Sequence, residues 1–255
     1  MLRVRVIPCL LLRQGSLVKT VRFRKPAYIG DPINTVRIFN ELEVDELAFL
    51  DVAASVEDQD PDLGVLRQIA DECFMPLSYG GGIRDVATAD RILQIGFEKV
   101  IVNSASFENP QLIADLARRF GSQAVVVSID VKRTLLGGYK VASRSATSVQ
   151  PQGPVQWARE VERLGAGEIL LTSVDREGTW QGFDVPLTAR VTDAVNVPVI
   201  AHGGAGSIEH MREVVRDGGA SAVALGSLVV YQNKGMGVLV NFPDKPTLTR
   251  ALNAT

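Results

Sequence analysis

Asp130 is the residue best placed for proton transfer in this 255-residue sequence. It ends an apolar run, and a carboxylate at the end of a buried strand is well suited to general acid–base catalysis. Asp51 ends a second apolar run and allows the same interpretation. For each aspartate the alternative is a structural role, as a helix cap or as an anchor of the following loop.

Two glycine-rich turns suit a phosphorylated ligand, because glycine lets backbone N–H groups approach an anion closely. After each turn, the next apolar run ends beside a serine hydroxyl that could bind phosphate oxygens. This pairing of turn and hydroxyl favours two phosphate sites over two ordinary strand-to-helix turns. The candidate phosphate-binding residues are Gly82, Asn103, Ser104, Gly178, Gly204, Gly226 and Ser227.

The two candidate phosphate sites belong to an internal repeat. Gly204 follows Gly82 at an interval close to half the length of the chain. Glu168 follows Glu46 at the same interval, and each glutamate opens an apolar run. A period this long predicts two similar halves, because the repeats of a solenoid are far shorter. A ligand with a phosphate at each end is therefore the first expectation.

Short apolar runs alternate with segments of helical period throughout the chain. The pattern predicts a (β/α)8 barrel of the TIM type, one domain over 1–255 with half-barrels at about 1–122 and 123–255. A doubly wound open sheet is the alternative, but it gives no reason for two equivalent halves. The expected strands are 4–11, 46–52, 76–79, 99–104, 124–130, 168–173, 198–201 and 222–226.

Two segments depart from this regular alternation. Residues 132–154 are too many for a simple loop, and they predict a small hairpin over the barrel mouth. Residues 231–246 have no helical period, so the eighth helix is expected to be delayed or short.

Side chains alternate between the two faces of a strand, so some charged residues are expected to point inward. These lie at the amino ends of the strands, the floor of the barrel, opposite the mouth. Buried charges are costly unless they are paired, so two cations and two carboxylates are expected to alternate in a ring. A purely structural salt-bridge plug is the alternative to a functional ring. The four residues are Arg5, Glu46, Lys99 and Glu168.

Composition excludes several classes of protein. The net charge of −2 argues against a strongly basic surface of the kind that binds nucleic acid. No segment approaches the roughly 18 apolar residues of a membrane span. Cys9 and Cys73 lie far apart in apolar surroundings, which favours reduced core thiols and a cytoplasmic protein. No metal or cofactor is expected, and His202 has no second ligand nearby in the sequence.

Several stretches together resemble one known family; they include Gly30-Asp31-Pro32, Phe49-Leu50-Asp51, Gly80-Gly81-Gly82-Ile83, Asp130-Val131-Lys132-Arg133 and the whole of 165–173. Over nearly its full length the chain resembles HisF, the cyclase (synthase) subunit of imidazole glycerol phosphate synthase, a lyase of histidine biosynthesis. That family is a two-fold-symmetric barrel whose floor docks on a glutaminase subunit to form a heterodimer. Ammonia from glutamine passes through the barrel and meets a phosphoribulosyl-formimino substrate at the mouth.

The resemblance assigns roles to the residues already singled out. It implies that Arg5, Glu46, Lys99 and Glu168 form the gate for ammonia, and that the seven candidate phosphate positions bind the substrate's phosphates. It also implies that Asp130 is one of two catalytic aspartates and that Lys19 belongs to a substrate-binding loop.

The second catalytic aspartate is missing. The family motif Cys-Leu-Asp is here Cys9-Leu10-Leu11, and a leucine cannot transfer a proton. Loss of one acid–base group costs about 10²–10⁴ in rate. The loop at 22–29 and the tail at 231–243 also depart from the family.

The chain thus combines an intact ammonia entrance with altered chemistry at the exit. In this combination it resembles one branch of the family, the HisF-like proteins of surface-polysaccharide gene clusters. These act with a HisH-like glutaminase and a separate ATP-dependent sugar amidotransferase, for acetamidino sugars of the lipopolysaccharide O-antigen. A genuine cyclase, in which Asp51 replaces the lost carboxylate, is the second hypothesis. A sugar-phosphate isomerase is the third, and the charged floor argues against it because an isomerase needs no ammonia.

Overall fold

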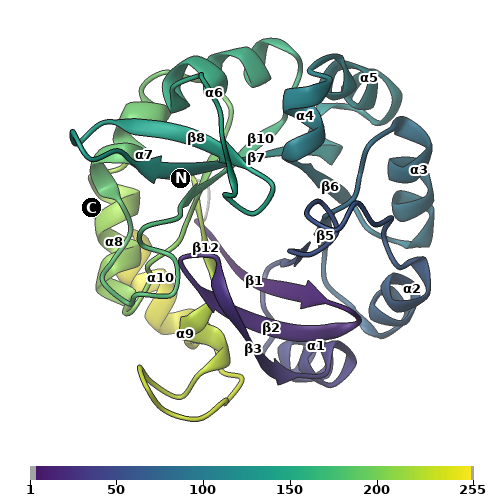
Figure 1. Cartoon of the computed structure of the whole chain (residues 1–255). Helices are drawn as coiled ribbons and strands as arrows, with labels where there is room; N and C mark the ends of the chain where they lie inside the picture. Colours follow the sequence, from purple (N-terminus) through teal and green to yellow (C-terminus); the bar gives the residue numbers. More distant parts are fainter. Residues whose placement is uncertain (1–3, 254–255) are drawn as a thin grey trace.

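Eight parallel strands form a closed barrel in residues 4–253, the part of the chain that this computed structural model describes (Figure 1). Each strand pairs with the next in chain order, and the last pairs with the first to close the barrel. The expected (β/α)8 barrel is therefore confirmed. The strands are β1 (Arg5–Arg13), β4 (Leu47–Asp51), β5 (Leu77–Gly80), β6 (Lys99–Val102), β7 (Val125–Arg133), β10 (Glu168–Ser173), β11 (Val199–His202) and β12 (Ala222–Leu225).

Helices surround the barrel on the outside, as Figure 1 shows. Aspartates begin the first three: the side chains of Asp31, Asp62 and Asp85 each accept an N–H from the first turn. The helices are α1 (Pro32–Glu41), α2 (Leu63–Glu72), α3 (Val86–Ile95), α4 (Ser104–Glu108), α5 (Gln111–Phe120), the 3-10 turn η1 (Ser122–Ala124), α6 (Pro154–Arg163), α7 (Val185–Thr192), α8 (Ile208–Arg216), α9 (Ser227–Val230) and α10 (Lys245–Asn253).

The first strand of each half continues beyond the barrel rim into an antiparallel hairpin. β1 continues into β2 (Ser16–Val21) and β3 (Arg24–Gly30), and β7 continues into β8 (Tyr139–Ser143) and β9 (Ser148–Val149). The hairpin expected within 132–154 is thus present. The segment 22–29, expected to be a loop, is mostly strand because β3 pairs with β2.

The tail beyond the last barrel strand is irregular, as expected. α9 is only four residues long, and the next helix begins at Lys245. Among residues 4–253, none of the helices is both long enough and apolar enough to cross a membrane.

The apolar core has two separate parts. The larger lies between the strands and the surrounding helices, and it includes the fully buried Phe39, Phe49 and Tyr79. The smaller fills the inside of the barrel, and it separates the charged floor from the mouth. Its members are Ile7, Cys9, Ala48, Ile101, Val126, Leu170, Ile200, Ala222 and Ala224.

Candidate active site

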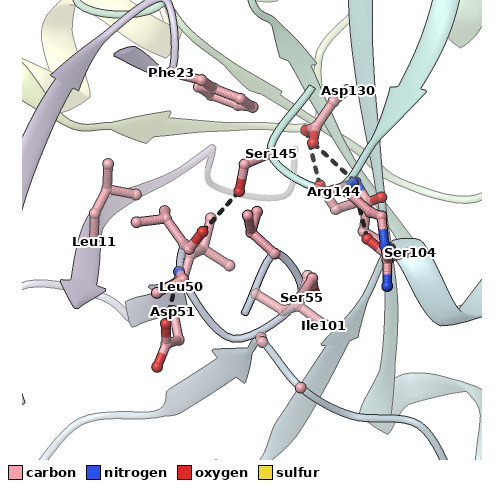
Figure 2. Close-up of a pocket in the computed structure, with 18 of the residues that line it drawn as sticks. Leu11, Phe23, Leu50, Asp51, Ser55, Ile101, Ser104, Asp130, Arg144 and Ser145 are labelled. Atoms are coloured by element: carbon pink, nitrogen blue, oxygen red, sulfur yellow. Dashed lines mark hydrogen bonds between the residues drawn. The ribbon is translucent and has the colours of Figure 1, made fainter. Parts of the chain in front are cut away.

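A cavity of about 320 Å³ opens at the carboxyl ends of the barrel strands. Active sites of such barrels lie at this end. Leu11, Phe23 and Leu50 give it an apolar wall, whereas Asp130 and Ser104 lie on another side (Figure 2). The cavity is of the size that holds a small-molecule ligand.

Asp130 is buried at this cavity and is held by neighbouring side chains. Its Oδ2 accepts a hydrogen bond of 2.9 Å from Asn103 Nδ2, and its Oδ1 accepts one of 3.3 Å from Ser128 Oγ. Burial raises the pKa of Asp130 to about 7, and the hydrogen bonds, including one from Thr172, offset part of this effect. A carboxyl group that titrates near neutral pH suits general acid–base catalysis.

Leu11 stands on the apolar wall of the same cavity and is only 5% exposed. It pairs with Leu50 on the neighbouring strand β4, and Leu50 packs against the inner core. A leucine, which cannot move a proton, therefore stands where the resembled family has its second aspartate.

Asp51 also lines the cavity, but its Oδ1 is engaged within its own loop. It accepts N–H groups from Ala53 at 2.9 Å and Ala54 at 3.0 Å. Burial raises the pKa of Asp51, while these two hydrogen bonds lower it in part. These two hydrogen bonds are those of an aspartate that orders its own loop. They favour the structural role that the sequence also allowed for Asp51.

The candidate phosphate positions of the N-terminal half border the large cavity. Gly82 has a left-handed φ of +67°, and a Cβ at this position would lie 2.6 Å from Gln59 O, so only glycine fits. Ser104 Oγ accepts the backbone N–H of Arg144 at 3.0 Å. Asn103 Oδ1 is buried without a hydrogen-bond partner among the described residues.

The candidate phosphate positions of the C-terminal half line a much smaller cavity, of about 10 Å³. Gly178, Gly204, Gly226 and Ser227 border it. Lys19 borders it as well, and so does Glu177, a residue that the sequence analysis did not single out. The two side chains form a buried ion pair at its edge.

At the floor, the four charged residues form one closed ring. Arg5 reaches Glu46 Oε2 at 2.7 Å and Glu168 Oε1 at 2.6 Å. Lys99 Nζ lies 3.2 Å from an oxygen of each glutamate. Each cation thus contacts both carboxylates and each carboxylate both cations, which satisfies charges that would otherwise be costly to bury.

His202 is buried between the two cavities and borders both. Its Nδ1 lies 3.1 Å from Thr172 Oγ1. Burial, followed by the nearby charge of Lys19, lowers the pKa of His202 to about 4, so the ring is neutral at physiological pH.

Comparison with known proteins agrees with this geometry. A family model described as "Histidine biosynthesis protein" matches residues 5–235. The chain belongs to this family. Within it, a "Putative imidazole glycerol phosphate synthase subunit hisF2" of Pseudomonas aeruginosa is 48% identical over 96% of this chain and 97% of its own length.

Two further relatives place the chain among the HisF-like synthase subunits. The "Imidazole glycerol phosphate synthase subunit HisF" of Alkaliphilus metalliredigens is 46% identical and covers 91% of this chain and 92% of its own length. A "Putative imidazole glycerol phosphate synthase subunit HisF" of Leptospira borgpetersenii is 45% identical over 96% of each chain. The match extends over the barrel, its floor and its mouth.

The two hairpins contribute parts of the mouth that the sequence did not predict. Arg144 and Ser145 follow β8 and reach across the N-terminal half: Ser145 Oγ donates to Val52 O at 2.8 Å, as Figure 2 shows. Phe23, at the tip of the first hairpin, packs against Ala142 and Val174. Apolar period and strand order do not reveal such cross-barrel contacts. Glu177 could have been found, since it directly precedes Gly178.

Proposed function

We propose that this HisF-like subunit receives ammonia from a HisH-like glutaminase and delivers it to another enzyme, with the cyclase reaction impaired. The acceptor enzyme is a sugar amidotransferase of O-antigen, or lipopolysaccharide, biosynthesis. The proposal rests on one observation: Leu11 makes a wall of the mouth apolar, while the charged ring at the floor of the same barrel is complete.

The floor ring and the inner core support the transport part of the proposal. Arg5, Glu46, Lys99 and Glu168 lie at the end of the barrel where ammonia would enter, as in the resembled gate. Above them the lumen is apolar and includes small residues such as Ala48 and Ala224. Ammonia is small and uncharged, so this lining suits its passage. At the mouth, the unpaired Asn103 Oδ1 could accept a hydrogen bond from it.

The phosphate positions support a ligand at the mouth. Gly82, Asn103 and Ser104 border the large cavity, so a phosphorylated group bound there would lie near Asp130. Lys19 would complete the family's substrate loop, but its ammonium group is engaged by Glu177.

A genuine cyclase of histidine biosynthesis is the second candidate function. The raised pKa of Asp130, about 7, favours it because one competent acid–base group remains at the mouth. Asp51 would then have to replace the lost carboxylate, and its hydrogen bonds to Ala53 and Ala54 hold it within its own loop.

The decisive experiment supplies ammonium salt and the phosphoribulosyl-formimino substrate to the purified chain, with the Alkaliphilus relative assayed in parallel. We expect imidazole glycerol phosphate to form about 10²–10⁴ times more slowly with this chain, the usual cost of losing one acid–base group. Equal rates would overturn the proposal in favour of the cyclase.

A reconstitution tests the transport part. The chain, a HisH-like glutaminase and a sugar amidotransferase are supplied with glutamine labelled at the amide nitrogen. We expect label in the sugar only when the chain is present. A glutaminase that neither co-purifies with the chain nor delivers label through it would contradict the proposed partner.

A further inference from the structure

We propose that the carboxylate of Glu177 is a built-in anion in the phosphate position of the C-terminal half, so that the mouth accepts ligands with a single phosphate group. This inference rests on the proposed function for the phosphate position of the N-terminal half. It departs from the ligand with two phosphates that the repeat alone favours.

Glu177 is buried and both of its carboxylate oxygens are engaged. Its side chain is only 2% exposed and forms an ion pair with Lys19, which is 7% exposed. Oε1 also accepts a hydrogen bond of 3.1 Å from Thr20 Oγ1, and Oε2 accepts one of 3.0 Å from Phe23 N. A cation, a hydroxyl and a backbone N–H are the same three kinds of donor that a phosphate group would use.

With the ion pair between Lys19 and Glu177 in place, the space left at this position is too small for a phosphate group. The cavity beside Glu177 measures about 10 Å³, against about 320 Å³ for the main cavity. A single water molecule already needs about 10–15 Å³. The Lys19 side chain also approaches Gly226 closely, because a Cβ at Gly226 would lie 3.0 Å from Lys19 Cε.

The same carboxylate holds the tip of the first hairpin. Arg22 and Phe23 connect β2 to β3 with left-handed φ values of 55° and 58°, which are costly for residues other than glycine, asparagine and aspartate. The backbone of Glu177 accepts the N–H of Arg22 at 3.0 Å, and its side chain accepts the N–H of Phe23. A phosphate that displaced Glu177 would therefore release the hairpin tip as well.

These contacts make a second phosphate unfavourable for a simple reason. A phosphate bound at Lys19 would leave the Glu177 carboxylate buried without its cation, and an unpaired buried charge is strongly destabilising. A ligand with one phosphate in the N-terminal half avoids this penalty, because it leaves the ion pair between Lys19 and Glu177 undisturbed.

The test counts phosphate sites by calorimetric titration of the full chain with inorganic phosphate. We expect one site in the natural chain and two in Glu177→Gln, because the amide no longer holds Lys19 against Gly226, so that the lysine can move out of this space and pair with a phosphate. The double variant Glu177→Gln/Lys19→Met should return to one site. Glu209→Gln, on the exposed face of α8, is the matched control and should keep one site.

A second measurement compares ribose 5-phosphate with ribulose 1,5-bisphosphate, and its first arm uses the natural chain alone. We expect the natural chain to bind the two within about threefold of each other, and Glu177→Gln to prefer the bisphosphate about tenfold, or about 1.4 kcal/mol. Two inorganic phosphates on the natural chain, or a clear preference for the bisphosphate, would overturn the inference while leaving the proposed function intact. A folded Glu177→Gln without a gain would also overturn it.

The remaining outcome separates the two proposals. If the natural chain bound no phosphate and Glu177→Gln bound one, the role of Glu177 would be supported. The phosphate position of the N-terminal half, and with it that part of the proposed function, would fail.

Discussion

Leu11 and Asp130 occupy equivalent positions in the two half-barrels. Leu11 pairs with Leu50 on the strand that follows in the barrel, and Asp130 pairs with Thr172 in the same way. One half therefore presents two leucines to the mouth where the other presents a carboxyl and a hydroxyl group. The fold keeps its two-fold symmetry while the chemistry of the mouth does not.

Restoring a carboxylate at this position should change activity. We expect Leu11→Asp to raise the rate of imidazole glycerol phosphate formation with ammonium salt by about 10²–10⁴, since one acid–base group contributes that much. Leu11→Asn is the control, because it has the same shape as aspartate and cannot take up a proton. Equal rates in the two variants would show that the missing carboxylate is not what limits the reaction.

Asp130 should make stability depend on pH. Burial raises the pKa of its carboxyl group from 3.8 to about 7, so the folded chain binds this proton more tightly than the unfolded chain. The stabilisation is fully present below about pH 4 and is lost as the pH rises through 7, by up to about 4 kcal/mol. Asp130→Asn should lack this loss.

Urea unfolding of the natural chain and of Asp130→Asn between pH 5 and 8 measures the difference. We expect the difference between the two free energies of unfolding to move in favour of the variant as the pH rises. A constant difference across this range would show that the carboxyl group is already ionised at pH 5.

His202 should have the opposite effect. Its pKa is lowered from 6.5 to about 4 by burial and by Lys19, so the folded chain binds this proton less tightly than the unfolded chain. The neutral His202 ring contributes about 3 kcal/mol to the free energy of unfolding. This contribution is fully present above pH 6.5 and is lost as the pH falls through 4. His202→Gln keeps a polar partner for Thr172 and should be less sensitive to acid in thermal unfolding.

NMR titration of the His202 ring provides a direct control for that prediction. A ring that titrated near pH 6.5 in the folded chain would contradict it, whatever the stability of the variant.

The four charged residues of the floor ring should stabilise the fold cooperatively. Glu46→Gln leaves Arg5 and Lys99 with one carboxylate between them, and removing one member of a fully buried pair costs about 3–5 kcal/mol. We expect about 1–3 kcal/mol here, because the Arg5 side chain is 29% exposed. A double-mutant cycle of Glu46→Gln with Lys99→Met, followed by urea unfolding, measures the coupling. Additive effects would argue against a cooperative ring.

Strand order and the inward face of each strand could be predicted from the sequence. Alternation was sufficient to bring Arg5, Glu46, Lys99 and Glu168 together, because each lies at the amino end of a parallel strand and faces inward. The apolar position of Leu11 followed from the same rule.

The contacts of the hairpins could not be predicted in this way. Glu177 meets Lys19 from a loop more than half the chain away, and Ser145 meets Val52 across the mouth. Local period carries no information about such pairs. The role of Asp51 was also open, since only its hydrogen bonds to Ala53 and Ala54 distinguish a loop anchor from a proton donor.

The apolar lining inside the barrel has a consequence for what can move along it. An ion that left water for a lumen of Ile7, Ala48, Val126 and Ala224 would lose its hydration shell with no partner to replace it, at a cost of tens of kcal/mol in the Born limit. A neutral molecule of the same size gives up only a few hydrogen bonds. Ammonium and ammonia differ by one proton. Under the proposed transport function, this apolar lining would admit ammonia and exclude ammonium, so the proton would stay on the side of the floor.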